Sequence, residues 1–263
     1  MGEWEKQVSN STLLLFQTVL IMHEERWYRK LIKADELVTF EVAIDETDLL
    51  VMATKDLTNE VTKLVLEVRE EIKKYIAGDP DFKESLIPYE VNNNAPKIIK
   101  EMANAGKLVD VGPMAAVAGA IAEYVGKGIL KHSKEVIVEN GGDIFIKTLR
   151  KRKIGIYAGS SPLSNKIAIE INSKDTPSGI CTSSGTVGHS LSFGKADAAV
   201  VLSSSNSLAD AAATKIGNLV KEPKDIEQAI EFAKTIPLLK GVIIIKDDKM
   251  GVWGGDKISV NIS

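Results

Sequence analysis

Serine, threonine and glycine are concentrated around a single histidine in residues 181–194, CTSSGTVGHSLSFG. Glycine lets such a backbone turn several N–H groups toward an anion, and the hydroxyl groups add further hydrogen-bond donors. We therefore predict a loop that binds a phosphorylated ligand. Its predicted contacts are Thr182, Ser183, Ser184, Gly185 and Thr186, with His189 beside them. The alternative is a surface connection of the same composition that binds nothing.

The same segment contains two nucleophile–base combinations. Cys181 with His189 would form a thiolate pair, and Ser183 or Ser184 with His189 would pair a hydroxyl with a base. Neither combination has the flanking residues of a nucleophile elbow, which argues against a serine hydrolase. A buried structural cysteine is the favoured interpretation of Cys181. His189 is interpreted either as a ligand contact or as a hydrogen-bonded structural residue.

A second segment, residues 208–214 (LADAAAT), carries two oxygen ligands on one helical face. Asp210 and Thr214 are four residues apart, so a helix presents their carboxylate and hydroxyl together. Magnesium prefers such hard oxygen ligands and completes its octahedron with phosphate oxygens or water. Alternatively, Asp210 interacts with the helix dipole and Thr214 bonds its own helix. The spacing alone favours this structural alternative.

A third segment, residues 138–144 (VENGGDI), places adjacent glycines between two hydrophobic runs. Gly141 and Gly142 permit a tight turn or the close approach of a ligand to the backbone. Asn140 or Asp143 would then hydrogen-bond a base or a ribose. A plain β-hairpin explains the pattern equally well.

Strands and helices must position these segments, and hydrophobic periodicity predicts where they lie. Residues 57–77 show apolar positions three and four apart and predict an amphipathic helix, whereas 79–94 predict a long loop. Small residues surround 112–125, which predicts a central helix that other backbone approaches closely. Further helices are predicted at 96–105, 207–220 and 225–235. Strands are predicted at 39–44, 48–53, 135–139, 143–147, 154–158, 166–171, 196–203, 241–245, 251–254 and 258–262.

The composition is that of a globular protein. The 263 residues are 44% hydrophobic and 26% charged, so neither disorder nor a membrane bundle fits. A net charge of −3 supplies no electrostatic attraction to nucleic acid. The single cysteine excludes an internal disulfide, and with three histidines it does not form a zinc cluster. These features predict a cytoplasmic protein with neither a nucleic-acid nor a membrane partner.

The first 25 residues differ from the rest. Their apolar stretch, 12–22, is about half the length that spans a bilayer. Glu3 and Glu5 do not suit the basic start of a signal peptide. We expect residues 1–25 to be an extension outside a single domain at 26–263.

Several long runs together resemble an uncharacterised family of bacterial and archaeal proteins related to the ApbE-type FAD:protein FMN transferases. The runs begin at Arg26 and extend over nearly the whole chain. They are RWYR (26–29), ETDL (46–49), VGPMAAVAGAIAE (111–123), VENGGDI (138–144), YAGSSPL (157–163), CTSSGTVGHSLSFG (181–194) and ADAAAT (209–214). The resemblance implies an α+β fold of ApbE-like, T-fold-like architecture, with antiparallel sheets and packed helices around a central cleft.

The resemblance also implies site residues. The transferases' Gly-Gly-Asp segment matches residues 141–143, and their Thr-Ser-Gly segment is similar to 182–185. Their Ala-Asp-x-x-Ala-Thr magnesium motif matches 209–214, which assigns Asp210 and Thr214 to the metal. A backbone carbonyl that the transferases use beside a Lys-Gly pair corresponds to Val117.

The function implied is magnesium-dependent transfer of a nucleotide or flavin phosphate, with FAD or another nucleotide as the ligand and a protein as acceptor. His189 and Asp210 would be the catalytic residues. The transferases' Lys-Gly is Ala118-Gly119 here, and the aspartate of their His-x-x-Asp-Pro-x-Thr-Gly motif is missing after His189. The alternative is a non-catalytic flavin or small-molecule binding protein. A structural protein without a ligand is a third interpretation.

Overall fold

The computed structural model describes residues 27–32, 34, 36–187, 193–254 and 261–262. The chain divides into two compact units, Met1–Lys30 and Leu31–Ser263. Of the first unit, only the beginning of a 3-10 helix, η1 (Trp27–Leu31), is described. The prediction for residues 1–25 therefore lies outside the described residues. All other elements belong to the second unit.

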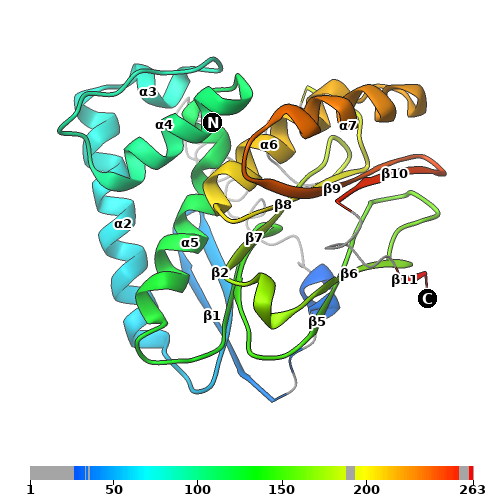
Figure 1. The fold of residues 1–263 in the computed structure, drawn as a ribbon. Coiled ribbons are helices and arrows are strands. Elements are labelled where there is room, and N and C mark those ends of the chain that lie inside the picture. Colours follow the sequence, from blue (N-terminus) through cyan, green and yellow to red (C-terminus); the bar gives the residue numbers. More distant parts are fainter. Residues whose placement is uncertain (1–26, 33, 35, 188–192, 255–260, 263) are drawn as a thin grey trace, which may run out of the picture. The chain divides into compact units, whose positions relative to one another are not determined.

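An eight-stranded antiparallel sheet forms the centre of the second unit (Figure 1). Its strands, in spatial order, are β1 (Val38–Ile44), β2 (Thr47–Ala53), β3 (Val136–Asn140), β4 (Asp143–Lys147), β7 (Ser178–Ser183), β8 (Ala198–Ser203), β9 (Leu239–Lys246) and β10 (Lys249–Trp253). Every neighbouring pair is antiparallel. The antiparallel α+β fold class predicted from the sequence is confirmed.

Helices cover one face of this sheet. They are α2 (Thr58–Gly78), α3 (Asp81–Glu84), α4 (Lys97–Val109), the 3-10 turn η2 (Pro113–Ala116), α5 (Val117–Ile129), α6 (Asn206–Leu219), η4 (Pro223–Asp225) and α7 (Ile226–Thr235). Helix α2 buries Val61, Val65, Val68 and Ile72, the positions that its periodicity predicts.

A three-stranded sheet covers the opposite face. It consists of β5 (Arg152–Gly155), β6 (Ile167–Ile171) and β11 (Asn261–Ile262), and the 3-10 turn η3 (Ser173–Asp175) follows β6. Strand β2 shows how the large sheet serves both cores: Leu49 and Val51 belong to the helical core, whereas Leu50 and Met52 belong to the core beneath the small sheet. Alternate residues of a strand point to opposite faces, so a strand buried on both faces is hydrophobic throughout.

Three predicted segments differ from the structure. The helix predicted at 112–125 is a 3-10 turn followed by α5, because Ala116 has φ −113° and ψ 1°, outside the helical region. Residues 181–183, predicted as loop, are the end of β7. Residues 178–180 of this strand pair with β4, and pairing with β8 extends the strand through residues 181–183 despite their small and polar side chains. Helix α3 interrupts the loop predicted at 79–94.

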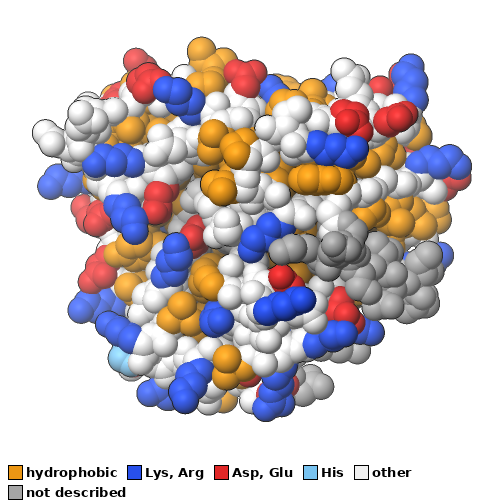
Figure 2. Space-filling view, in the orientation of Figure 1, with side chains coloured by type: hydrophobic (Ala, Val, Ile, Leu, Met, Phe, Trp, Pro, Cys, Tyr) orange, Lys and Arg blue, Asp and Glu red, His pale blue; other side chains and the backbone are white. Residues whose placement is uncertain are grey.

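Basic and acidic side chains both occur across the face of the molecule seen in Figure 2, and hydrophobic side chains lie between them.

No single helix of the described residues is both long enough and apolar enough for a membrane span. The bent pair Lys97–Val109 and Pro113–Ile129 passes the same criteria of length and composition when taken together.

Candidate functional site

The hairpin between β3 and β4 carries the first group of predicted site residues. Gly141 and Gly142 have φ angles of 65° and 103°, the positive values that a two-residue hairpin turn requires. Asn140 and Asp143 are paired across the turn. The Glu139 carboxylate accepts a hydrogen bond of 2.7 Å from the Gly142 amide and stabilises the turn. The segment is therefore a hairpin, and its last residue, Asp143, is buried.

Helices α5 and α6 meet beside this hairpin. The Asp210 carboxylate of α6 accepts a hydrogen bond of 2.8 Å from the Gly119 amide in the first turn of α5. A Cβ atom on Gly119 would lie 2.6 Å from the Asn206 carbonyl oxygen and 2.8 Å from Asp210 Cβ. Only glycine allows this approach. The small residues that predicted a closely approached helix thus bring Asp210 to the start of α5.

Asp143 and Asp210, here called the acidic pair, are two buried carboxyl groups that influence each other electrostatically. Burial raises the pKa of Asp143 well above its ordinary value, and the charge of Asp210 raises it further. Burial also raises the pKa of Asp210 from 3.8 to about 7, although amide hydrogen bonds from Gly119 and Ala118 oppose that rise. One oxygen of Asp143, Oδ1, is buried and has no hydrogen-bond partner among the described residues. A cation bound between the two carboxylates would supply the missing partner of this oxygen and compensate the negative charge.

Cys181 lies in β7, against the acidic pair. Its thiol is fully buried and lies 3.5 Å from the Asn206 carbonyl oxygen. Burial raises the pKa of Cys181 well above its ordinary value, and the charges of Asp143 and Asp210 raise it further. These effects keep the sulfur protonated, so the structure supports the structural interpretation of Cys181 over a thiolate nucleophile.

Two asparagines hold the first turn of α5 in place. Asn140 Nδ2 donates to the Ala118 carbonyl at 3.1 Å, and Asn206 Nδ2 donates to the Gly119 carbonyl at 3.2 Å. Asn206 Oδ1 is buried without a partner in the described part of the chain. Asn140 was predicted from the hairpin pattern. Asn206 was missed, although its position at the start of a helix is a signal that sequence reasoning can use.

The other two predicted metal ligands, Val117 and Thr214, lie on the helices α5 and α6. Val117 is the first residue of α5, Thr214 follows Asp210 by one turn of α6, and both are half-buried. The described residues contain no group of three or more His, Cys, Asp or Glu side chains that could hold a metal ion. Two carboxylates, one hydroxyl and a backbone carbonyl are all hard oxygen donors, and the unpartnered Asp143 oxygen fits a cation.

The predicted ligand loop divides into two parts. Thr182 and Ser183 belong to β7, and the Thr182 amide donates to the Asp143 carboxylate. Beyond them, the Ser184 hydroxyl accepts hydrogen bonds from the amides of Thr186 and Val187 at 3.1 and 3.0 Å. The Gly185 amide donates to the Ala196 carbonyl at 2.9 Å. The amides of residues 185–187 therefore already have partners within the protein. His189 lies outside the described residues.

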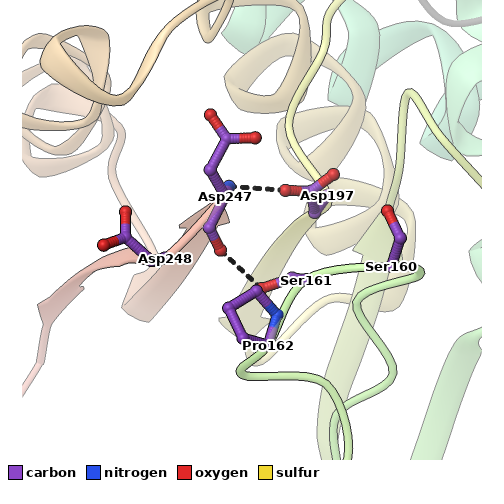
Figure 3. Close-up of a pocket in the computed structure, with 6 residues that line it drawn as sticks. All are labelled: Ser160, Ser161, Pro162, Asp197, Asp247 and Asp248. Carbon is purple, nitrogen blue, oxygen red and sulfur yellow. Dashed lines mark hydrogen bonds between the residues drawn. The ribbon is translucent and has the colours of Figure 1, made fainter.

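A pocket of about 290 Å³ lies at the far end of this loop (Figure 3). It is lined by Ser160, Ser161, Pro162, Asp197, Asp247 and Asp248. The Asp197 carboxylate accepts a 2.6 Å hydrogen bond from the Asp247 amide and a 3.3 Å hydrogen bond from the Thr186 hydroxyl. Ser161 donates to the Asp247 carbonyl at 2.6 Å. The hydroxyl of Thr186 is thus directed to this pocket wall.

Sequence reasoning missed Asp197. It stands in the hydrophobic run that leads into β8, and it is buried. A charged residue inside a run of buried hydrophobic residues was the available signal, because such a group needs partners to be buried.

Comparisons with known proteins agree on the family. A family model described as "AbpE bacteria" matches residues 29–239. The UPF0280 protein of Methanococcus aeolicus is 43% identical over 220 residues, covering 81% of this chain and 89% of that protein. The UPF0280 protein of Methanosarcina acetivorans is 42% identical over 212 residues, covering 80% and 83%.

Solved structures show the same fold at low sequence identity. The flavin transferase ApbE from Vibrio cholerae has a TM-score of 0.59 and 13% identity, covering 85% of this chain and 99% of that one. The flavinyl transferase ApbE of Pseudomonas stutzeri, in its apo form, has a TM-score of 0.54 and 10% identity, covering 86% and 97%. The architecture is thus ApbE-like, and the match to the family model shows that the chain belongs to the family described as AbpE bacteria, together with its UPF0280 relatives.

Proposed function

We propose that this protein is a magnesium-dependent enzyme that transfers a nucleotide or flavin phosphate group, in the manner of the flavin transferases whose fold it shares. The observation that carries the proposal is the acidic pair. The negative charges of Asp210 and Glu139 both raise the pKa of Asp143. Burying carboxylates against each other costs free energy unless a cation compensates them. A divalent cation supplies that compensation.

The residues proposed to hold magnesium are Asp210, Thr214 and the Val117 carbonyl, with Asp143 facing the same point. Bound there, magnesium would neutralise negative charge on a pyrophosphate. The amides of Gly119 and Ala118 donate to the Asp210 carboxylate and orient it. The hydrogen bonds of Asn140 and Asn206 to the first turn of α5 keep that turn from moving away.

The nucleotide is proposed to lie along the hairpin and the end of β7. Gly141 and Gly142 leave the backbone open there, and a Cβ on Gly142 would meet only Thr182 at 3.6 Å or more. Asn140 and the hydroxyls of Thr182 and Ser183 are the proposed contacts. His189 or Asp210 is proposed to accept the proton of an acceptor hydroxyl on a partner protein.

Calorimetry with magnesium and ADP or FAD tests the binding half of the proposal. Magnesium keeps its waters unless a phosphate helps to bind it, so magnesium and nucleotide together should bind more tightly than either alone. Asp210→Asn should weaken the magnesium-dependent binding about tenfold or more, because it removes a ligand charge while keeping an acceptor for Gly119. Equal magnesium-dependent binding by the wild type and Asp210→Asn would show that Asp210 is not part of the site.

Incubation with FAD, magnesium and a threonine-bearing acceptor protein tests the transfer half. Release of AMP with flavin labelling of the acceptor would support transfer. Binding without either product would favour the second candidate, a flavin or nucleotide carrier. One feature supports that candidate: Ala118 stands where the transferases carry a lysine, so no ammonium group is present at that position.

A further inference from the structure

Helices α5 and α6 are joined by two hydrogen bonds that run in opposite directions. The Glu123 carboxylate of α5 accepts a hydrogen bond of 2.8 Å from the amide of Asn206, the first residue of α6. In return, the Asp210 carboxylate of α6 accepts from the Gly119 amide in the first turn of α5. Each helix therefore supplies an acidic side chain that satisfies an N-terminal amide of the other.

The spacing of these residues makes the arrangement a closed ring. Gly119 and Glu123 are four apart on α5, and Asn206 and Asp210 are four apart on α6, so each pair lies along one face of its helix. The Asn206 side chain crosses the ring to the Gly119 carbonyl at 3.2 Å. Glu123 and Asp210 are both buried. The ring fixes the relation between the two helices at the point where Asp210 joins the acidic pair.

The two halves of the ring differ in what else supports them. Helix α6 has its own N-cap, because the Ser205 hydroxyl accepts from the Leu208 amide at 3.3 Å. Helix α5 has no such cap: its N-cap residue, Ala116, makes no side-chain hydrogen bond. The Asp210 carboxylate therefore provides the first turn of α5 with an acceptor that its own N-cap residue does not supply, and Glu123 anchors the start of the helix that carries Asp210.

We propose that Glu123 is a positioning residue for the cation and nucleotide site: by holding the Asn206 amide it sets where α6 places the Asp210 carboxylate. A test of this inference by cation binding rests on the function proposed above, whereas a test by hydrogen exchange of the Gly119 amide does not. The other carboxylate oxygen of Glu123 pairs with the half-exposed Lys127 ammonium at 2.6 Å. Lys127 is thus a natural control, because its removal changes the charge around Glu123 without breaking the ring.

The experiment compares four variants by two measurements. Glu123→Ala opens the ring, Glu123→Gln keeps an acceptor oxygen at the same reach, and Lys127→Ala removes only the outer ion pair. Glu135→Ala removes a buried glutamate that bonds Arg152 and Thr148, and it controls for lost stability without touching α6.

Manganese binding in the presence of ADP is followed by electron paramagnetic resonance. Hydrogen exchange of the Gly119 amide is followed by nuclear magnetic resonance, relative to Val138 in β3.

Glu123→Ala should weaken manganese binding about tenfold, the effect typical of residues that orient metal ligands. It should also accelerate Gly119 exchange relative to Val138, because the bond to Asp210 opens locally. Glu123→Gln, Lys127→Ala and Glu135→Ala should all leave manganese binding and Gly119 exchange near their wild-type values. Equal effects of Glu123→Ala and Glu135→Ala, or no rescue by glutamine, would overturn the proposal.

The structural assay separates this inference from the proposed function. If the wild-type protein binds no manganese with ADP, the proposed function fails. The Gly119 exchange of Glu123→Ala then still decides whether Glu123 positions Asp210. Unchanged exchange in that variant would refute the positioning role on its own.

Discussion

Asp197 and the acidic pair are buried carboxyl groups of the same domain, but their partners differ. Asp197 accepts hydrogen bonds from the Asp247 amide and the Thr186 hydroxyl, and the Lys246 ammonium lies 3.8 Å from it. Asp143 has an oxygen with no partner in the part of the chain that the structure describes, and the charges of Asp210 and Glu139 raise its pKa. The protein satisfies one buried carboxylate with its own groups and leaves the other incomplete.

This difference distinguishes a structural carboxylate from one available to a ligand. Desolvating a carboxylate is costly unless hydrogen-bond donors or a positive charge compensate it. The donors to Asp197 and the nearby Lys246 ammonium belong to the fold itself, so the burial of Asp197 needs no ligand to explain it. Burial raises the pKa of both members of the acidic pair, and the charge of Asp210 raises that of Asp143 further, so burying them together gains nothing for the fold. The comparison therefore favours the acidic pair as the cation site over the Asp197 pocket, although three aspartates line that pocket.

The largest expected effect is that of Asp210→Ala on cation binding. This variant removes both a carboxylate ligand and the acceptor for the Gly119 amide. Magnesium affinity measured by calorimetry with ADP should fall about 100-fold, at the upper end of losses for altered metal sites. Asp197→Ala is the matched control and should bind as the wild type does. A loss of similar size in the control would reverse the assignment of the two regions.

The acidic pair should also make stability depend on pH when no divalent cation is present. The folded-state pKa of Asp210 is raised from 3.8 to about 7, so its contribution to stability is fully present below pH 3.8 and is lost as pH rises through 7. Between about pH 5 and 7.5 this loss amounts to about 2–3 kcal/mol of unfolding free energy relative to Asp210→Asn.

Urea unfolding of both proteins in a chelator, at several pH values, measures this difference. Carboxylates whose pKa is lowered, such as Asp45 beside Lys73 and Arg69, act in the opposite direction. They are present in both proteins and cancel in the comparison. Magnesium should restore the stability of the wild type at the higher pH. Parallel pH profiles for the two proteins would mean that Asp210 carries no such cost.

Asp197→Ala should lower stability by about 2 kcal/mol while cation binding stays unchanged. The substitution leaves the Asp247 amide and the Thr186 hydroxyl without their acceptor and Lys246 without one of its two carboxylates. For a chain of this size the melting temperature should fall by about 4–8 °C. An unchanged melting temperature would show that Asp197 is not a structural group, and the pocket would then become the stronger candidate site.

Thr214→Val should produce the smallest effect. Valine has nearly the shape of threonine, so the helix should keep its packing while one weak oxygen ligand is lost. Magnesium affinity with ADP should fall about fivefold, equivalent to about 1 kcal/mol. Thr186→Val is the control in the other region and should leave the affinity unchanged. A larger effect of Thr186→Val would connect the Asp197 pocket to the nucleotide.

Local patterns predicted much of the fold. The apolar spacing of residues 57–77 predicted α2, and the adjacent glycines predicted the turn between β3 and β4. The end of β7 was missed, because its small and polar residues carry no strand pattern and only pairing with β8 makes it a strand. Strand formation there depends on neighbours rather than on the segment itself.

The sequence by itself determined which residue types were available for chemistry: a carboxylate and a hydroxyl one turn apart at Asp210 and Thr214, and an aspartate after two glycines at Asp143. Only the tertiary structure decided that Asp210 meets an amide 91 residues away at Gly119 and faces Asp143 in a buried environment. Helical periods and turn preferences act over a few residues and can be read locally. Desolvation and the interaction of two charges depend on distance in space, which exists only after the helices and strands have packed together.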